Sequence, residues 1–478
     1  MSKLKNIIKQ LSTKDYTAIY DSLINSNAEK SAYLLKFMRE KQLSDTRIME
    51  ELEVNNNAYY TLRSRLNQKI EEYLLQEMES PRTSLIKKVA TIHDIIFTKK
   101  RAIAIATLKK LEKELLDYDL SNELTIVYKT LKKLLINNPE DHFNYSQLYN
   151  RHVAYMLAID KAEDLLANYF KKYGDYFLTH DETDKIGLEL LKNEMNNVAN
   201  LYQSHRLFVY QSFINIFHQI YIEEKTTLEM ESVFEKIQNI FDLYYLDAIY
   251  YHLILVLEFL KTEYYSITDR NGKFNKAIED INESIPTIVS NYSLYTFSPK
   301  ILLTKQQHYL QERTEKMMYG ETKELFEDFE INKQNLPEYV IYTNYRASAC
   351  FFSEKYDEAA KILNNLLNET ALKKYPNALL EIKLFLALQY VMMKDHDLFN
   401  QLINSIQRQI RLLGKEQCMH AVTLTKIFKT TLNESRKGKK GKIMLQISKI
   451  TTLLPKYYSP FNTIPLDETF ADKLANVI

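Results

Sequence analysis

Glycine and proline are both scarce in this chain. Its 478 residues contain 7 glycines and 9 prolines, whereas average usage would supply roughly five times as many glycines and more than twice as many prolines. Both residue types mark turns and interrupt helices. A long chain that lacks them has few tight turns and almost no β-hairpins. We therefore expect an all-α fold in which helices follow one another through short polar connections.

Apolar residues recur at helical spacing along most of the chain. Leu85, Val89, Ile92 and Ile96 are separated by 4, 3 and 4 residues, so they are expected on one helix face. Connections are expected where capping and turn residues cluster, as at residues 137–140. Because short connections force neighbouring helices to run antiparallel, the pattern predicts a series of helical hairpins.

Charge and cysteine content limit the cellular setting. The chain has 63 Lys and Arg residues against 62 Asp and Glu residues, a net charge of +1, so no global basic field would attract nucleic acid or an anionic membrane. Cys350 and Cys418 match no disulfide or zinc spacing, and free thiols suit a reducing compartment. The beginning of the chain lacks the apolar core of a secretory signal, and the most apolar stretch, residues 248–260, is too short and too polar to span a bilayer. We expect a cytoplasmic protein without membrane partners.

The scarcity of glycine also argues against several catalytic classes. Only Gly438 and Gly441 lie close together, so the chain has no dinucleotide fingerprint, Walker loop, kinase loop or nucleophile elbow. No histidine begins a His-Glu-x-x-His motif. Cys418 and His420 are two residues apart, which would place them on different faces of a helix. We expect no catalysis, no cofactor and no metal ion.

A degenerate repeat places an alanine between larger apolar residues at the start of a helix. Its copies are centred on Ala162, Ala277 and Ala359. A small alanine lets the two helices of a hairpin approach closely, while the larger residues pack into the neighbouring helix. The clearest copy lies at residues 340–373, with its best-matching part at residues 345–367.

This copy resembles a tetratricopeptide repeat. Ala347 stands where the family has its small residue on the first helix, and residues 355–359 match the family's turn into the second helix. Thr343 replaces the usual aromatic residue of the first helix, and Glu354 replaces the usual glycine of the turn. The resemblance implies a right-handed α-solenoid of antiparallel helix hairpins.

The first functional hypothesis is a non-catalytic scaffold that binds a protein or peptide partner. Stacked hairpins form a concave groove, and tetratricopeptide-like proteins use that groove to hold peptides or partner helices. In the register of the best copy, the groove face carries Ile341, Asn344, Ser348 and Phe351. An asparagine amide can bond a peptide backbone, and a phenylalanine ring can contact its side chains.

The second hypothesis is a cytoplasmic DNA-binding transcriptional regulator whose solenoid senses a ligand or oligomerises. Residues 28–79 form a compact three-helix pattern, with helices expected at 29–42, 45–52 and 58–76. Ser44 can cap the second of these helices, and Asn55, Asn56 and Asn57 supply a turn and a cap for the third. The arrangement resembles a helix–turn–helix.

Polar and basic side chains near the start of the third helix are suited to the major groove of DNA. We expect Arg63, Arg65, Gln68 and Lys69 to make the nucleic-acid contacts on this hypothesis. Glu53 stands where the motif usually has glycine, and nearby glutamates would repel phosphate. The alternative is that residues 28–79 only cap the solenoid and present an ordinary solvated face.

Three regions are expected along the chain. Residues 1–80 form an N-terminal helical module and residues 81–434 form the solenoid. Residues 435–478 comprise a basic joint, a short helix and a C-terminal tail that contains Pro455, Pro460 and Pro465. The basic run at 436–442 is expected to be a solvated joint between helices, with an acidic or phosphate-bearing partner as the alternative. The sequence does not identify the partner or the oligomeric state.

Overall fold

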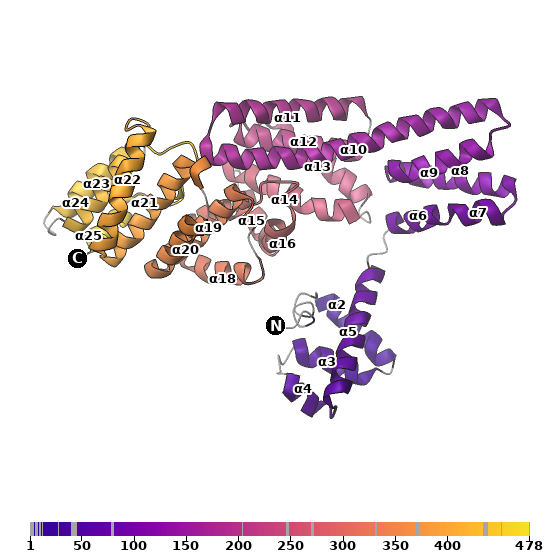
Figure 1. Cartoon of the computed structure of the whole chain (residues 1–478), viewed down its shortest axis with the longest axis horizontal. Coiled ribbons are helices and arrows are strands. Elements are labelled where there is room, and N and C mark those ends of the chain that lie inside the picture. Colours follow the sequence, from indigo (N-terminus) through magenta and orange to yellow (C-terminus); the bar gives the residue numbers. More distant parts are fainter. Residues whose placement is uncertain are drawn as a thin grey trace. The chain divides into compact units, whose positions relative to one another are not determined.

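The fold is helical throughout the part of the chain that the structure describes, as the scarcity of glycine and proline predicts (Figure 1). The residues that the structure describes form α-helices and short 3₁₀ helices, and none of them forms a strand. The structure is a computed structural model, and it describes residues 4, 8, 11, 13–26, 28–39, 45–77, 81–202, 204–244, 248–268, 272–329, 332–369, 372–433, 438–450 and 452–477. Across these ranges, no helix combines the length and the apolarity needed to cross a bilayer.

The chain divides into two compact units. Unit 1 comprises Met1–Ser146 and Tyr244–Tyr251, and unit 2 comprises Gln147–Leu243 and His252–Ile478. The division falls within helix α10 (Pro139–Thr179), whereas the expected boundary lay after residue 80. A boundary inside a helix carries no proline, glycine or linker composition, so the sequence offered no signal for it.

Unit 1 begins with a helical module that has its own core. Its helices are α2 (Thr13–Asn25), α3 (Glu29–Arg39), α4 (Asp45–Glu51) and α5 (Asn56–Glu77). Helix α3 packs against both α2 and α5. The bounds of α3, α4 and α5 agree with the predicted helices to within three residues. The core of the module contains buried side chains from all four helices, among them Ile19, Leu23, Leu34, Leu35, Met38, Ile48, Leu66 and Ile70.

The rest of unit 1 includes four shorter helices before α10. They are α6 (Pro81–Ala90), α7 (Ile92–Thr98), α8 (Arg101–Asp117) and α9 (Ser121–Leu134). Helix α8 packs against α6, α7 and α9. Leu85, Val89 and Ile92 are buried as predicted, but the chain turns at Thr91, so the expected single apolar face is divided between α6 and α7.

Unit 2 is a succession of helices in which neighbours along the sequence pack on one another. Helix α19 packs on α20, α20 on α21, and α21 on α22. Its earlier helices are α11 (Glu182–Leu201), α12 (His205–Tyr221), α13 (Glu229–Leu243), α14 (Ala248–Thr268, whose first residues belong to unit 1), α15 (Lys273–Asn282), α16 (Ile285–Asn291), α17 (Pro299–Gln311), η1 (Glu315–Met317) and α18 (Met318–Asp328). Its later helices are α19 (Leu336–Phe352), α20 (Tyr356–Glu369), η2 (Leu372–Lys374), α21 (Pro376–Met393), α22 (His396–Leu413), α23 (Met419–Asn433), α24 (Lys439–Ile450), η3 (Pro460–Asn462) and α25 (Glu468–Ala475).

Charged and polar residues make the tight turns that glycine usually makes at helix ends. The described residues with left-handed backbone and a side chain have φ between 50° and 61°, and they are Glu53, Asp119, His180, Glu224, Arg313, Glu354 and Lys394. A left-handed backbone costs a residue with a Cβ atom about 1–2 kcal/mol. The scarcity of glycine therefore does not remove tight helix ends from this chain. Instead, charged and polar residues form these helix ends in left-handed backbone, which costs conformational free energy.

Candidate functional site

Helices α4 and α5 are joined by a left-handed turn at the position where the predicted helix–turn–helix has its turn. At the end of α4, the Val54 amide donates to the Met49 carbonyl at 3.1 Å, and Glu53 takes a left-handed φ of 50°. The Asn55 side chain then accepts a hydrogen bond from the Ala58 amide at 2.9 Å and caps α5, as predicted. The position where the motif usually has glycine therefore has the backbone conformation that favours glycine, even though the residue is Glu53. The other predicted cap, Ser44, lies outside the described residues.

The exposed side of α5 is polar and basic. Between Ala58 and Ile70 the sequence contains no carboxylate. Residues spaced by one and four positions along this stretch form a continuous exposed stripe, which we call the α5 face: Tyr60, Thr61, Ser64, Arg65, Gln68 and Lys69. The opposite side of the helix buries Tyr59, Leu66 and Ile70 in the core of the module.

Three of the four predicted nucleic-acid contacts lie on the α5 face. Arg65, Gln68 and Lys69 are exposed, and they line one side of a surface cleft of about 640 Å³ whose other wall comes from α2 and α3. Arg63 is only partly exposed. Its guanidinium carbon lies 5.7 Å from the centre of the Tyr59 ring and 5.9 Å from that of Tyr60. Arg63 therefore packs on aromatic rings beside the α5 face.

The predicted peptide-binding residues of α19 do not line an open groove. The exposed fractions of Ile341, Asn344, Ser348 and Phe351 are 0%, 1%, 2% and 2%. The side-chain amide of Asn344 donates to the carbonyl of Val340 in its own helix at 2.9 Å. The prediction of an open binding face on α19 is therefore wrong, because other elements of unit 2 cover this helix on all sides.

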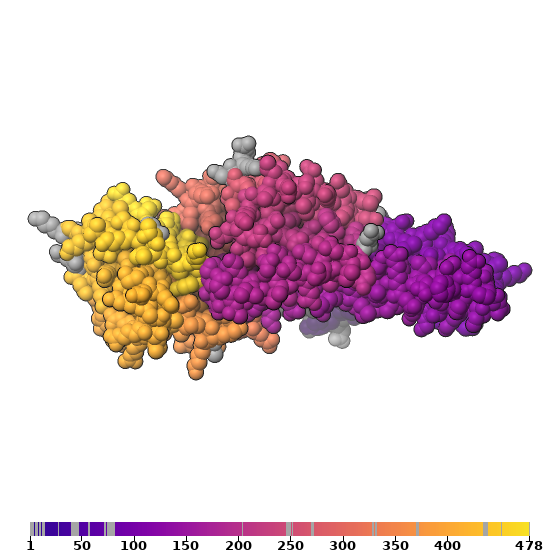
Figure 2. Space-filling model, turned by 90° about the horizontal axis from the view of Figure 1, so that it is seen from above, coloured from indigo at the N-terminus to yellow at the C-terminus, as the bar shows by residue number. Residues whose placement is uncertain are grey.

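Part of that cover comes from the C-terminal residues of the chain, which belong to the yellow region that lies against orange residues in Figure 2. The short helix η3 contacts both α19 and α21. Its Phe461 ring lies 6.1 Å from Phe385 and 6.4 Å from Phe428, measured between ring centres. In α25, the Lys473 ammonium lies 4.9 Å from the centre of the Phe351 ring. The chain's own C-terminal residues thus occupy space where the sequence predicted a partner peptide.

Buried hydrogen bonds hold this C-terminal segment in place. The Ser459 hydroxyl donates to Oε2 of Glu381 at 2.5 Å, and Nε2 of His420 lies 2.6 Å from Oε1 of the same carboxylate. The amide of Gln306 donates to the Thr463 hydroxyl at 3.0 Å. Because the carboxylate rather than the imidazole bonds the serine, this is not the order of a serine-hydrolase triad. The cluster fixes the segment to α21 and α23.

The expected C-terminal tail is therefore a folded part of unit 2. Its prolines exclude a long helix, but Tyr458, Phe461 and Ile464 are buried between them. The expected solvated joint is also wrong at Lys439, which is 3% exposed and donates to the Val477 carbonyl at 2.7 Å. The first residues of the basic run, 436–437, lie outside the described residues.

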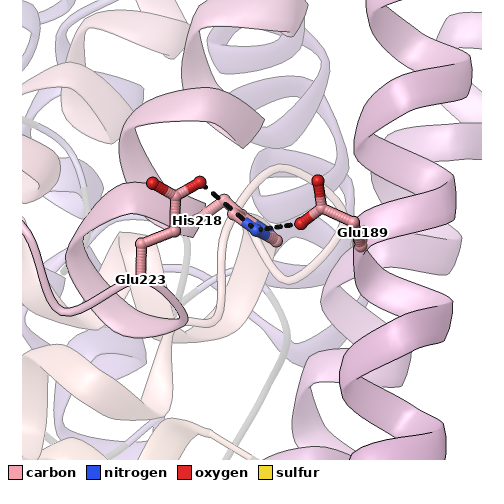
Figure 3. A group of neighbouring side chains, drawn as sticks. All are labelled: Glu189, His218 and Glu223. Carbon is pink, nitrogen blue, oxygen red and sulfur yellow. Dashed lines mark hydrogen bonds and ion pairs between the residues drawn. The ribbon is translucent and has the colours of Figure 1, made fainter.

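A second polar cluster, at His218, includes residues that the sequence did not single out (Figure 3). His218 lies in the last turn of α12, and its Nε2 is 2.9 Å from Oε2 of Glu189 in α11. The same nitrogen is 3.8 Å from Oε1 of Glu223, just after α12. On the other side of the ring, Nδ1 is 3.0 Å from the hydroxyl of Tyr169 in α10. The imidazole is fully buried, while both carboxylates reach solvent.

Lys192 pairs with both carboxylates of this cluster. Its ammonium is 2.9 Å from Oε1 of Glu189 and 3.2 Å from Oε1 of Glu223. Burial and the Lys192 charge lower the pKa of His218, against the opposing effect of the two carboxylates. Although partial burial acts to raise the pKa of Glu189, the hydrogen bond and charge of Lys192 lower it. At neutral pH the cluster therefore contains a neutral imidazole and an ionised Glu189 beside an ammonium group.

No local spacing in the sequence identifies the His218 cluster. Glu189 and His218 are 29 positions apart, and they meet only because α11 packs against α12. Sequence motifs for metal sites use short spacings, so they do not identify this group. His218 and Glu223 are five positions apart, which is not the spacing of a His-Glu-x-x-His motif.

No known protein family, curated protein or solved structure matches this chain. Among the described residues, the α5 face, the C-terminal segment and the His218 cluster are distinctive candidate sites. The α5 face presents several exposed polar groups on a single helix.

Proposed function

We propose that the N-terminal module binds double-stranded DNA through the α5 face. The observation that carries the proposal is the left-handed turn at Glu53, which joins the short helix α4 to a longer helix with an exposed polar and basic stripe. A helix–turn–helix places its second helix in the major groove in this way. The side chains on the α5 face are of the kinds that bond phosphates and base edges.

The roles of the individual side chains follow from their chemistry. Arg65 is suited to a phosphate or to the two acceptors of guanine, and Gln68 to the donor–acceptor pair of adenine. Lys69 is suited to a phosphate as a point charge. Because the chain as a whole carries a net charge of only +1, the attraction is local. We expect an affinity that depends on few phosphate contacts.

Fluorescence anisotropy with a labelled mixed-sequence duplex tests this function. The affinity of the full chain should fall as salt rises from about 50 to 200 mM, since binding releases counterions. Changing Arg65 and Lys69 together to alanine should weaken binding at least roughly tenfold and flatten the salt dependence by about one unit of slope per lost phosphate contact. Lys110→Ala, an exposed lysine of α8, is the matched control and should leave the affinity unchanged. A full chain that fails to bind the duplex even at low salt would contradict the proposal.

For unit 2, which contains most of the residues 81–434 that the sequence assigned to a solenoid, we propose the finer architecture of a right-handed tetratricopeptide-like solenoid. Two features of its best copy support this. Glu354, where the family has glycine, takes a φ of 61° in the turn between α19 and α20, and Ala347 and Ala359 are fully buried. Cys350 and Cys418 are buried free thiols, which supports the proposed cytoplasmic setting.

A second candidate function is the binding of a peptide or partner protein by unit 2. It is favoured by one observation: the unit already holds a segment of its own chain that lacks α-helix, residues 453–464, through Glu381 and Gln306. A partner with a similar segment would have to replace residues 453–464. Unit 2 would thus bind a partner by exchanging its own segment for the partner's.

A labelled peptide of residues 453–466 tests this second function. It should bind the full chain more tightly when Ser459→Ala weakens the hold of the resident segment, and circular dichroism should show that the variant keeps its helices. Equal binding to the variant and the unaltered chain, or binding to neither, would contradict replacement.

A further inference from the structure

We propose that Glu189, His218 and Glu223 form a binding site for a divalent transition-metal ion, with Zn²⁺ as the best match, and that Lys192 competes with the ion. The ligand atoms of the three side chains all lie within 4.8 Å of one another (Figure 3). Imidazole nitrogen and carboxylate oxygen are both ligands of Zn²⁺, and a mixed set of this kind favours it over Mg²⁺. A water molecule would complete a four-coordinate site.

The ligand atoms, all within 4.8 Å of one another, lie near the separations of a tetrahedral site. Tetrahedral ligation with bonds of about 2.1 Å places ligand atoms about 3.4 Å apart. The distance of 2.9 Å from His218 to Glu189 and that of 3.8 Å from His218 to Glu223 lie on either side of this value. The side chains of Glu189 and Glu223 are 48% and 34% exposed, so they have room to rotate, while the buried imidazole stays fixed.

Tyr169 fits the second layer of such a site. A histidine that binds a metal ion usually donates its other ring N–H to a neighbouring oxygen. When Nε2–H donates to Glu189, Nδ1 accepts from the Tyr169 hydroxyl. When Nε2 faces an ion, Nδ1–H can donate to that same hydroxyl, because a hydroxyl both donates and accepts. The contact of 3.0 Å thus supports either tautomer without any movement of the His218 ring.

Lys192 is the reason that the site is weak in the unaltered chain. Its ammonium lies between the two carboxylates, at 2.9 and 3.2 Å. An ion bound to both carboxylates must displace this ammonium and would be repelled by it at short range. Removing the lysine charge should therefore strengthen metal binding, whereas removing a carboxylate should weaken it. A purely structural salt bridge does not predict this pair of opposite effects.

Isothermal titration of the full chain with ZnCl₂ tests the site. Lys192→Met should bind one Zn²⁺ at least roughly tenfold more tightly than the unaltered chain, since the competing charge is gone. In the Lys192→Met background, Glu223→Gln should abolish that gain, and Tyr169→Phe should reduce the affinity about 10- to 100-fold. MgCl₂ should give no comparable binding to any of these proteins. Glu223 is partly exposed, so its substitution tests the site without emptying the core.

Two results would overturn the proposal. One is the absence of saturable Zn²⁺ binding in Lys192→Met while its thermal unfolding matches that of the unaltered chain. The other is Zn²⁺ binding that Glu223→Gln and Tyr169→Phe leave unchanged, which would place the ion elsewhere.

Discussion

Helix α5 in unit 1 and helix α19 in unit 2 were both expected to present a binding face, yet only α5 leaves that face exposed. Helix α5 packs against α2 and α3 on one side. Helix α19 is contacted by α17, α18, α20, α21 and η3, and nearly every one of its residues is buried. The comparison teaches that the periodicity of a helix identifies its inward face. The periodicity does not show whether a segment far away in the sequence covers the outward face of that helix.

The composition of the two helices contains a further signal. Helix α19 carries apolar or aromatic residues in every direction, including Val340, Ile341, Ala349 and Phe352. A helix that is apolar all round is normally buried all round. Helix α5 instead separates Tyr59, Leu66 and Ile70 from a polar stripe. This contrast, rather than the position within a repeat, distinguishes the covered helix from the exposed one.

The largest expected effect tests whether the C-terminal segment is part of the core that covers α19. Phe461→Ala should lower the free energy of unfolding of unit 2 by about 3–5 kcal/mol, because it empties a site among Phe385 and Phe428. Phe97→Ala, at a residue that is 85% exposed, is the same substitution in a solvated position and should cost less than about 0.5 kcal/mol. Urea denaturation measures both. Equal small losses would mean that the segment only rests on the surface.

A smaller effect is expected from the hydrogen bond that holds the same segment. Ser459→Ala should destabilise unit 2 by about 1.5–3 kcal/mol, since it leaves an oxygen of the buried Glu381 carboxylate unsatisfied. Thr469→Ala, an exposed hydroxyl at the start of α25, serves as the control. Urea midpoints compare the two variants. A urea midpoint for Ser459→Ala equal to that of the control would contradict the role of Glu381 in holding the segment.

The burial of α19 also predicts a dependence on pH. Burial raises the pKa of Glu338, in the first turn of α19, to about 7. Because the folded-state pKa lies above the ordinary value of 4.5, folding favours the protonated form, and Glu338 destabilises the fold as pH rises from about 4.5 to 7. Glu338→Gln should therefore stabilise unit 2 at pH values above about 7 by about 1–2 kcal/mol, after allowance for its partial exposure, and should do so little near pH 4.5.

Glu51→Gln, at an exposed residue of α4, is the control for this pH series. Its effect on the urea midpoint should not change over the same range. A Glu338→Gln effect that is equally flat would show that α19 leaves this carboxyl solvated.

The smallest effects concern the turns that α5 and α19 have in common. Glu53→Gly and Glu354→Gly should each stabilise the chain by about 0.5–1 kcal/mol, because both residues have left-handed backbone. Glu50→Gly, in right-handed α4, should destabilise it by a similar amount. Thermal unfolding followed by circular dichroism distinguishes the signs. Destabilisation by all three substitutions would contradict the turn geometry that supports both motif assignments.

The sequence predicted the parts of this molecule that depend on local patterns. The helical class and a cap among Asn55, Asn56 and Asn57 follow from composition and capping chemistry. Motif spacing placed the usual turn glycines at Glu53 and Glu354, which both adopt the left-handed backbone of such turns. The cover of α19 by Phe461 and the meeting of Glu189 with His218 depend on packing between residues far apart in the chain. Neither hydrophobic periodicity nor motif spacing predicts contacts between residues far apart in the sequence, so only the structure shows these features.

Hydroxyl-radical footprinting of the full chain, with and without duplex DNA, tests the contrast between the two helices most directly. Tyr60 on the α5 face is 62% exposed, whereas Phe351 on α19 is 2% exposed. We predict that Tyr60 is oxidised in the free protein and protected by the duplex, and that Phe351 is unmodified in both samples. Oxidation of Tyr60 that DNA leaves unchanged, or ready oxidation of Phe351 in the free protein, would contradict the account.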